Sequence, residues 1–109
     1  MLRLAEGPLL YMSFTDYAQN VRDGNAKGMS FPDASGNTRT GVGMYAALSF
    51  DEGKTWAHRK LIPNWIKRPW KSRSSGYLSS VQTPDGMIHL VSSRFYYRFN
   101  LAWLKQLPE

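Results

Sequence analysis

The chain has 109 residues, a formal net charge of +6 and no cysteine. This length fits one small domain with a modest core, and the absence of cysteine excludes a disulfide framework and a cysteine-ligated metal site. Hydrophobic residues make up 42% and aromatic residues 14%, which is typical of a globular chain. The charge suits an anionic ligand but is mild for a nucleic-acid-binding protein. No apolar run approaches the roughly 18 residues of a membrane-spanning helix. We therefore expect no nucleic-acid partner and no membrane partner.

Six strands are predicted in chain order, because apolar and β-prone residues recur between glycine- and proline-containing turns. They cover residues 9–15, 42–50, 56–62, 77–83, 87–93 and 99–104. Two polar stretches, residues 16–40 and 63–76, are predicted to be loops. No amphipathic helix is convincing, although residues 101–107 have helical propensity over a short length. The pattern predicts an all-β fold of antiparallel sheets.

Residues 49–56 read Ser-Phe-Asp-Glu-Gly-Lys-Thr-Trp and predict a β-hairpin connection. Asp51 is expected to accept hydrogen bonds from backbone N–H groups two or three residues ahead, and Ser49 to add a second local bond. Gly53 supplies the positive φ that a tight bend needs. Trp56 then restarts a strand and is expected to bury its indole against a neighbouring sheet.

This octet resembles the Asp-box, S-x-D-x-G-x-T-W, of the sialidase-like β-propellers. Residues 7–13 and 86–92 also echo one another, each a turn glycine followed by a strand that ends near a serine. The resemblance implies that residues 1–109 are one partial β-propeller region from a six-bladed parent. Residues 1–63 would form a blade with the Asp-box, residues 64–76 a loop, and residues 77–109 the start of the next blade.

A second stretch, residues 76–88, is similar to the sialidase segment in which a tyrosine precedes an apolar strand, Asp-Gly and another apolar strand. The resemblance implies that Tyr77 is the catalytic nucleophile. A neutral tyrosine avoids the repulsion that a carboxylate nucleophile would meet near the carboxylate of a sialic acid, and sialidases are an exception to the two-carboxylate scheme. No cofactor is implied. The two histidines lack an acidic cluster, which argues against a metal site, and His89 is expected to be a partly buried group with satisfied nitrogen atoms.

Arg39, Arg73 and Arg94 are the candidates for substrate binding. Sialidases hold the substrate carboxylate with three arginines through paired, charge-assisted hydrogen bonds, and these three residues stand at loop positions or strand ends of this chain. Residues 94–100 also combine arginine with aromatic residues, a composition that suits stacking on sugar faces.

Residues 65–73 interleave tryptophan with lysine and arginine. Such a stretch can be a solvated loop, can bind an acidic glycan, or can bind single-stranded nucleic acid by stacking and phosphate contacts. The sequence leaves these three interpretations open, with the solvated loop favoured and nucleic acid least favoured.

The resemblance implies a fragment of a sialidase-like glycoside hydrolase that is exo-acting on an acidic or sialylated glycan. Such a fragment is expected to be inactive alone, because none of the glutamates is placed to assist Tyr77. The alternative is a non-catalytic carbohydrate-binding or protein-interaction module. Unpaired sheet edges are expected to favour self-association. The family is compatible with a secreted or periplasmic parent, but the sequence does not define a compartment.

Overall fold

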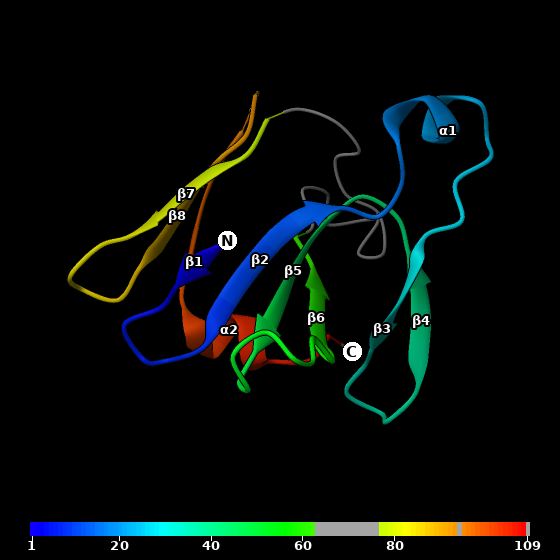
Figure 1. The fold of residues 1–109 in the computed structure, drawn as a ribbon. Coiled ribbons are helices and arrows are strands. Elements are labelled where there is room, and N and C mark those ends of the chain that lie inside the picture. Colours follow the sequence, from blue (N-terminus) through cyan, green and yellow to red (C-terminus); the bar gives the residue numbers. More distant parts are fainter. Residues whose placement is uncertain (63–76, 94, 109) are drawn as a thin grey trace.

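The computed structural model describes residues 1–62, 77–93 and 95–108, and it is built mainly of antiparallel strands (Figure 1). The elements, in chain order, are β1 (Leu2–Arg3), β2 (Leu9–Phe14), α1 (Ala18–Arg22), β3 (Met29–Pro32), β4 (Thr38–Gly41), β5 (Met44–Ser49), β6 (His58–Leu61), β7 (Ser79–Gln82), β8 (Ile88–Val91), β9 (Tyr96–Phe99) and α2 (Leu101–Lys105). The all-β prediction is confirmed at this level, with two short helices added.

A four-stranded antiparallel sheet in the order β1-β2-β5-β6 forms the centre of the molecule. Its longest pairing joins β2 to β5, from Leu9 opposite Ser49 to Phe14 opposite Met44. Side chains of a strand alternate between the two faces of its sheet. On β5, Met44 and Leu48 therefore face one side, while Tyr45 faces the other. We call this sheet the central sheet.

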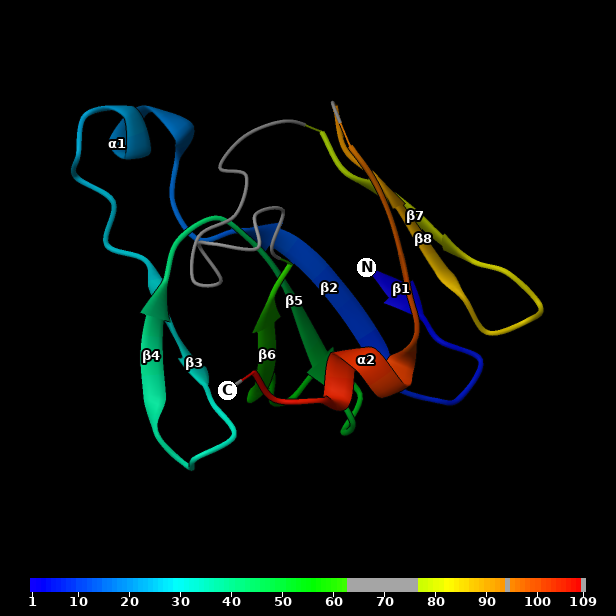
Figure 2. The same ribbon diagram turned by 180° about the vertical axis from the view of Figure 1, so that it is seen from behind.

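A second antiparallel sheet of three strands, in the order β7-β8-β9, follows later in the chain. Figures 1 and 2 place it on one side of the central sheet and the β3–β4 hairpin on the other. We call it the outer sheet. Its inward face carries Ile88 and Leu90, which are both fully buried.

The hydrophobic core lies between the two sheets, because its members come from both. They are Leu4, Leu10, Met44, Ala46, Leu48, Ile62, Ile88, Leu90, Phe99 and Leu104. Each large side chain in this cluster contributes about 1.5–3 kcal/mol through removal of apolar surface from water. The two sheets are thus held together by hydrophobic contacts, which alternate residues of their strands make.

The β3–β4 hairpin packs against the opposite side of the central sheet. Phe31 is fully buried there, and its ring meets the Tyr45 ring edge-on at a centroid distance of 6.1 Å. Gly41 allows this approach, because a Cβ at that position would lie 2.4 Å from Leu61 Cδ1 and 3.0 Å from the Phe31 ring. Residues 16–40 were predicted to be a loop, and this prediction was wrong: they contain α1 as well as this hairpin.

The strand predicted over residues 99–104 was also wrong, because the chain leaves β9 at Phe99 and forms α2. The Asn100 side chain caps this helix by accepting a hydrogen bond from the Trp103 N–H at 2.9 Å. Tertiary contacts then hold a helix that is too short to be stable alone. The five other predicted strands are confirmed as β2, β5, β6, β7 and β8, with shorter bounds.

Two basic side chains of β6 bind the carboxyl end of α2. His58 Nε2 lies 2.9 Å from the Leu104 carbonyl oxygen, and Lys60 Nζ donates to the carbonyls of Trp103 and Gln106 at 2.8 Å each. The last carbonyls of a helix have no partner within the helix, and they attract positive charge. This contact attaches α2 to the edge of the central sheet.

Candidate functional site

The 49–56 turn closes through a dense set of local hydrogen bonds. Asp51 Oδ1 accepts from the Thr55 N–H at 2.9 Å and from the Ser49 hydroxyl at 2.8 Å, while Oδ2 accepts from the Thr55 hydroxyl at 2.6 Å. Ser49 Oγ in turn accepts from the Gly53 N–H at 2.8 Å, and Gly53 has φ +88°. The predicted second bond at Ser49 is confirmed. The backbone donor to Asp51 is four residues ahead, so the predicted spacing of two or three was wrong.

The hydrogen bonds to Asp51 hold its carboxylate in the charged form. The Thr55 hydroxyl, the Thr55 N–H and the Ser49 hydroxyl lower the pKa of this carboxyl below its ordinary value. All of these donors lie within the turn itself. The carboxylate therefore serves the local backbone, and its geometry is that of a structural turn.

Trp56 fastens the turn to its own sheet. Its indole N–H donates to the Gly53 carbonyl at 3.1 Å, and its ring meets Tyr11 of β2 edge-on at 6.1 Å. The indole is half-buried. The expected contact with a neighbouring sheet was wrong, since Tyr11 belongs to the same central sheet as the strand after the tryptophan.

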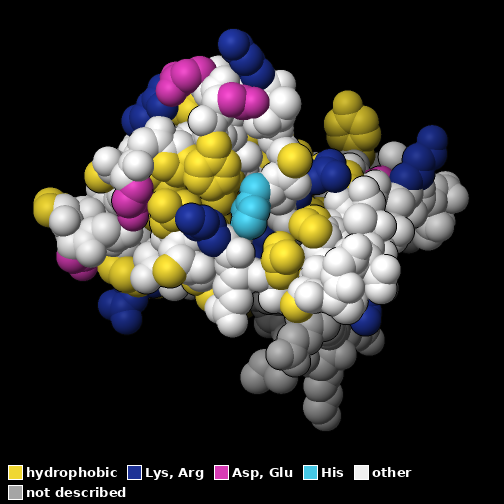
Figure 3. Space-filling model, turned by 90° about the horizontal axis from the view of Figure 1, so that it is seen from below, with side chains coloured by type: hydrophobic (Ala, Val, Ile, Leu, Met, Phe, Trp, Pro, Cys, Tyr) yellow, Lys and Arg dark blue, Asp and Glu magenta, His cyan; other side chains and the backbone are white. Residues whose placement is uncertain are grey.

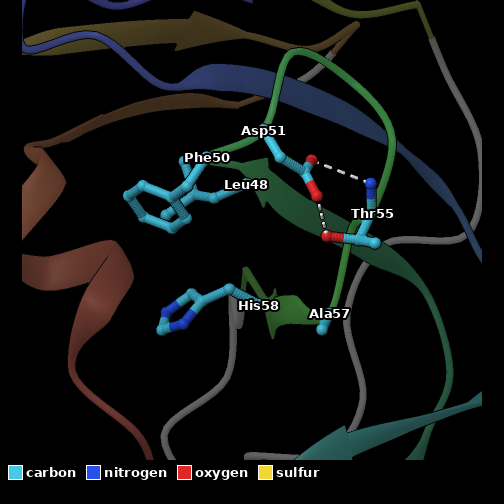
Figure 4. Close-up of a pocket in the computed structure, with 6 residues that line it drawn as sticks. All are labelled: Leu48, Phe50, Asp51, Thr55, Ala57 and His58. Carbon is cyan, nitrogen blue, oxygen red and sulfur yellow. Dashed lines mark hydrogen bonds between the residues drawn. The ribbon is translucent and has the colours of Figure 1, made fainter.

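A shallow cavity of about 350 Å³ lies beside this turn (Figure 4). It is lined by Leu48, Phe50, Asp51, Thr55, Ala57 and His58. The Phe50 and His58 rings project to the same side and meet at 87°, with centroids 6.4 Å apart. Lys105 Nζ lies 5.9 Å from the Phe50 ring centre. Figure 3 looks onto this end of the molecule and shows hydrophobic side chains gathered beside a histidine.

Tyr77 lies two residues before β7, with 89% of its surface exposed. Its backbone N–H donates to Ser93 Oγ at 2.8 Å. Among the described residues, no carboxylate is hydrogen-bonded to its hydroxyl. The described residues therefore place no acid partner at this hydroxyl. The nucleophile assignment for Tyr77 remains a prediction.

Arg39 lies on β4 and is paired with a buried carboxylate. Its Nε is 3.3 Å from Asp33 Oδ2, and the Asp33 side chain also closes the β3–β4 turn by accepting from Ser35 and Asn37. β4 and β7 lie on opposite sides of the central sheet (Figures 1 and 2). The elements nearest Arg39 and Tyr77 are thus not neighbours in this arrangement.

The other two candidate arginines, Arg73 and Arg94, lie outside the described residues. The same holds for the tryptophan-containing basic stretch at residues 65–73. Their assignments to an acidic glycan therefore stay predictions from the sequence.

Sequence reasoning missed a row of hydrogen-bonded side chains on the outer sheet. His89 bonds to Tyr96 through one ring nitrogen and to Thr83 through the other. The expectation that His89 is partly buried with satisfied nitrogen atoms is confirmed. The pairing with Tyr96 depends on the register of β8 with β9, and the only sequence signal for it was the alternation of residues in both strands.

Lys60 is a second polar group that the sequence did not single out. Only 8% of its surface is exposed, and its ammonium lies 3.7 Å from the centre of the Trp103 ring. Burial lowers the pKa of Lys60 to about 8. The Lys60 ammonium donates its hydrogen bonds to the carbonyls of α2, so this lysine has a structural role. Because its pKa is about 8, it loses its charge at mildly alkaline pH.

Within residues 1–62, 77–93 and 95–108, no group of three or more His, Cys, Asp or Glu side chains could hold a metal ion. Nor does this part of the chain contain a helix with the length and apolar character needed to cross a membrane.

Comparison with known proteins adds no relative: no protein-family model, no curated protein and no solved structure matches this chain.

Proposed function

We propose that this chain is part of a sialidase-like β-propeller glycoside hydrolase that acts on the end of an acidic or sialylated glycan. The observation that carries the proposal is the 49–56 turn, in which Asp51 accepts three hydrogen bonds from its own loop. The five fixed positions of the motif all take part in the hydrogen bonds of this turn: Ser49, Asp51, Gly53, Thr55 and Trp56. This fit between motif and geometry supports the resemblance to the Asp-box families.

The arrangement of sheets adds support. The central sheet and the outer sheet are antiparallel, follow one another in the chain and pack face to face through an apolar core. Propellers are built from successive sheets around an axis. In this proposal the two sheets are one blade and the start of the next.

The chain alone is proposed to be inactive as a hydrolase. The described carboxylates are hydrogen-bonded elsewhere. Those of Asp33, Asp51 and Asp85 accept hydrogen bonds in local turns, and that of Asp16 accepts from the backbone of Lys27 and Gly28. Those of Glu6, Asp23 and Glu52 accept from Gln82, Gln19 and Arg3. A tyrosine nucleophile needs a base and a separate acid to share the proton transfers. Measurable turnover of a fluorogenic sialoside by the purified chain would contradict this.

A non-catalytic carbohydrate-binding module is the second candidate. The absence of a carboxylate partner for Tyr77 in the described residues favours it, since a binding surface needs only arginine and aromatic groups. The two candidates share the ligand, an acidic glycan, and differ in whether the parent protein hydrolyses it.

Binding of the acidic glycan is tested by electrophoresis of the chain through gels that contain polysialic acid or neutral dextran. We expect retardation only by polysialic acid, and its reduction in Arg39→Gln, Arg73→Gln and Arg94→Gln. The matched control is Arg22→Gln on α1, which removes the same charge at an exposed position. Equal loss in the control and the three variants would mean that net charge alone is responsible, and would contradict the assigned residues.

A further inference from the structure

The outward face of the outer sheet carries a hydrogen-bonded pair, Tyr96 and His89, that the proposed function does not use. Ile88 and Leu90 of β8 face the core, so His89 and Val91 face outward. Cross-strand pairing sets Arg98 beside His89 and Tyr96 beside Val91. The Tyr96 side chain is 59% exposed and reachable from solvent.

A chain of hydrogen bonds runs from Tyr96 through His89 to a turn. The Tyr96 hydroxyl oxygen lies 2.5 Å from His89 Nδ1, and His89 Nε2 lies 3.1 Å from Thr83 Oγ1. Thr83 Oγ1 lies 2.5 Å from Asp85 Oδ1, and the Met87 N–H also donates to that oxygen, at 3.1 Å. The four side chains come from β9, β8 and the β7–β8 turn, so the register of the sheet brings them together.

The chemistry of the groups fixes the direction of the protons. The Asp85 carboxylate only accepts, so the Thr83 hydroxyl donates to it in preference to the neutral Met87 carbonyl at 3.2 Å. Thr83 Oγ1 is then free to accept the proton of His89 Nε2. This leaves a lone pair on Nδ1, which faces the Tyr96 hydroxyl. A nucleophile, a base and a third group that orients the base are the parts of an activated nucleophile.

Ring stacking fixes the orientation of His89 relative to Tyr96. The His89 and Tyr96 rings are stacked, with centroids 5.8 Å apart and planes inclined by 19°. Tyr77, just before β7, offers a contrast, because it is more exposed and its hydroxyl has no hydrogen-bond partner among the described residues. If solvent exposure alone set reactivity, Tyr77 would be the more reactive tyrosine. If assistance by a base sets it, Tyr96 should be the more reactive one.

Arg98 favours a reactant that carries a negative charge. It is the cross-strand partner of His89, it is exposed, and no ion pair within the described residues neutralises it. An anion next to the His89–Tyr96 pair would find a guanidinium on the same face. The expected reactant is thus an electrophile that also carries a carboxylate.

We propose that Tyr96 is a nucleophile for acyl transfer from activated esters, with His89 as its general base and Arg98 as the anchor for an anionic group on the ester. His89 Nδ1 takes the phenol proton while the tyrosine oxygen bonds to the ester carbonyl carbon. The carbon–oxygen bond to the leaving alcohol then breaks, and the leaving oxygen receives the proton from Nδ1. The products are an acyl ester of Tyr96 and the free alcohol. This inference goes beyond the glycan proposal and does not rest on it.

The experiment treats the chain with p-nitrophenyl acetate and with mono-p-nitrophenyl succinate, and maps acylated tyrosines by peptide mass spectrometry. We expect Tyr96 to react about tenfold faster than Tyr77, a value below the usual gain from a general base because the face is open to water. His89→Gln should remove this advantage, and Asp85→Asn should reduce it while the histidine stays in place. In each variant the acylation rate of Tyr77 is the internal reference, because it reports how the same reagent reacts with a tyrosine that has no base beside it.

Arg98→Gln tests the anchor separately. It should lower acylation of Tyr96 by the anionic succinate more than acylation by the neutral acetate. Equal rates at Tyr96 and Tyr77, or an undiminished Tyr96 rate in His89→Gln, would overturn the activated tyrosine. An unchanged succinate-to-acetate ratio in Arg98→Gln would overturn the anchor. Neither result bears on whether the chain binds a glycan, so the two proposals fail independently.

Discussion

The central sheet and the outer sheet differ in how many of their faces are covered. The central sheet contacts the outer sheet on one face and the β3–β4 hairpin on the other, whereas the outer sheet buries only its inward face. The central sheet also carries the 49–56 turn and the fastening to α2. Most of the stabilising contacts therefore lie in the central sheet, while the exposed hydrogen-bonded pair of His89 and Tyr96 lies on the outer sheet.

Removing core volume should give the largest effect. Leu48→Ala in the central sheet should lower the free energy of unfolding by about 3 kcal/mol, because Leu48 is fully buried and a cavity would remain. Val91→Ala on the exposed face of the outer sheet should cost about 0.5 kcal/mol or less. Urea unfolding of both variants checks the contrast, and equal losses would contradict it.

The serine of the 49–56 turn should come next. Ser49→Ala removes a buried hydroxyl that bonds to Asp51 and to the Gly53 N–H, and should cost about 2 kcal/mol. Ser79→Ala on β7 is the matched control, because Ser79 is exposed, and it should change stability by less than about 0.5 kcal/mol. Thermal unfolding measures both. A harmless Ser49→Ala would show that the turn does not depend on its hydrogen bonds.

Lys60 predicts an alkaline dependence of stability. Its folded pKa of about 8 lies below the ordinary value of 10.5, so between these values the unfolded chain binds more protons. The free energy of unfolding should therefore rise as the pH increases from 8 towards 10.5. Lys60→Met should lose this rise, so the difference between the wild-type and variant pH profiles isolates the lysine. Parallel profiles would show that its pKa is not lowered by folding.

Self-association through the exposed edge of the outer sheet is the smallest effect that we expect. β7 is at one edge of the outer sheet and exposes Val81, so light scattering at high protein concentration should detect oligomers. Val81→Lys should reduce them, whereas Tyr17→Lys on the loop before α1 adds the same charge without touching a sheet. A monomer at every concentration would contradict the prediction.

The strands that bury alternate residues were predictable from the sequence, and so was the turn at residues 49–56. The β3–β4 hairpin was missed because β4 reads Thr-Arg-Thr-Gly, with three exposed residues and little apolar signal. The Asp33 and Gly36 turn before it was the available clue. α2 was missed because β-prone residues precede it, although Asn100 is a good helix cap.

For the candidate site, the sequence proposed individual residues but not the partners that the fold gives them. Arg39 was predicted as a ligand group, yet the pairing with Asp33 depends on the turn between β3 and β4. The contact of His89 with Tyr96 depends on strand register, which single-sequence patterns do not define. Contacts between strands are set by the fold as a whole, and they are what the sequence could not provide.

Recognition of an acidic sugar is the claim on which the functional account depends. Saturation-transfer-difference nuclear magnetic resonance of the chain with sialyllactose, and with lactose as the matched neutral ligand, tests it most directly. We expect saturation of the neuraminic acid protons of sialyllactose and no saturation of the protons of free lactose. Equal saturation of both sugars, or none of either at millimolar ligand, would contradict it.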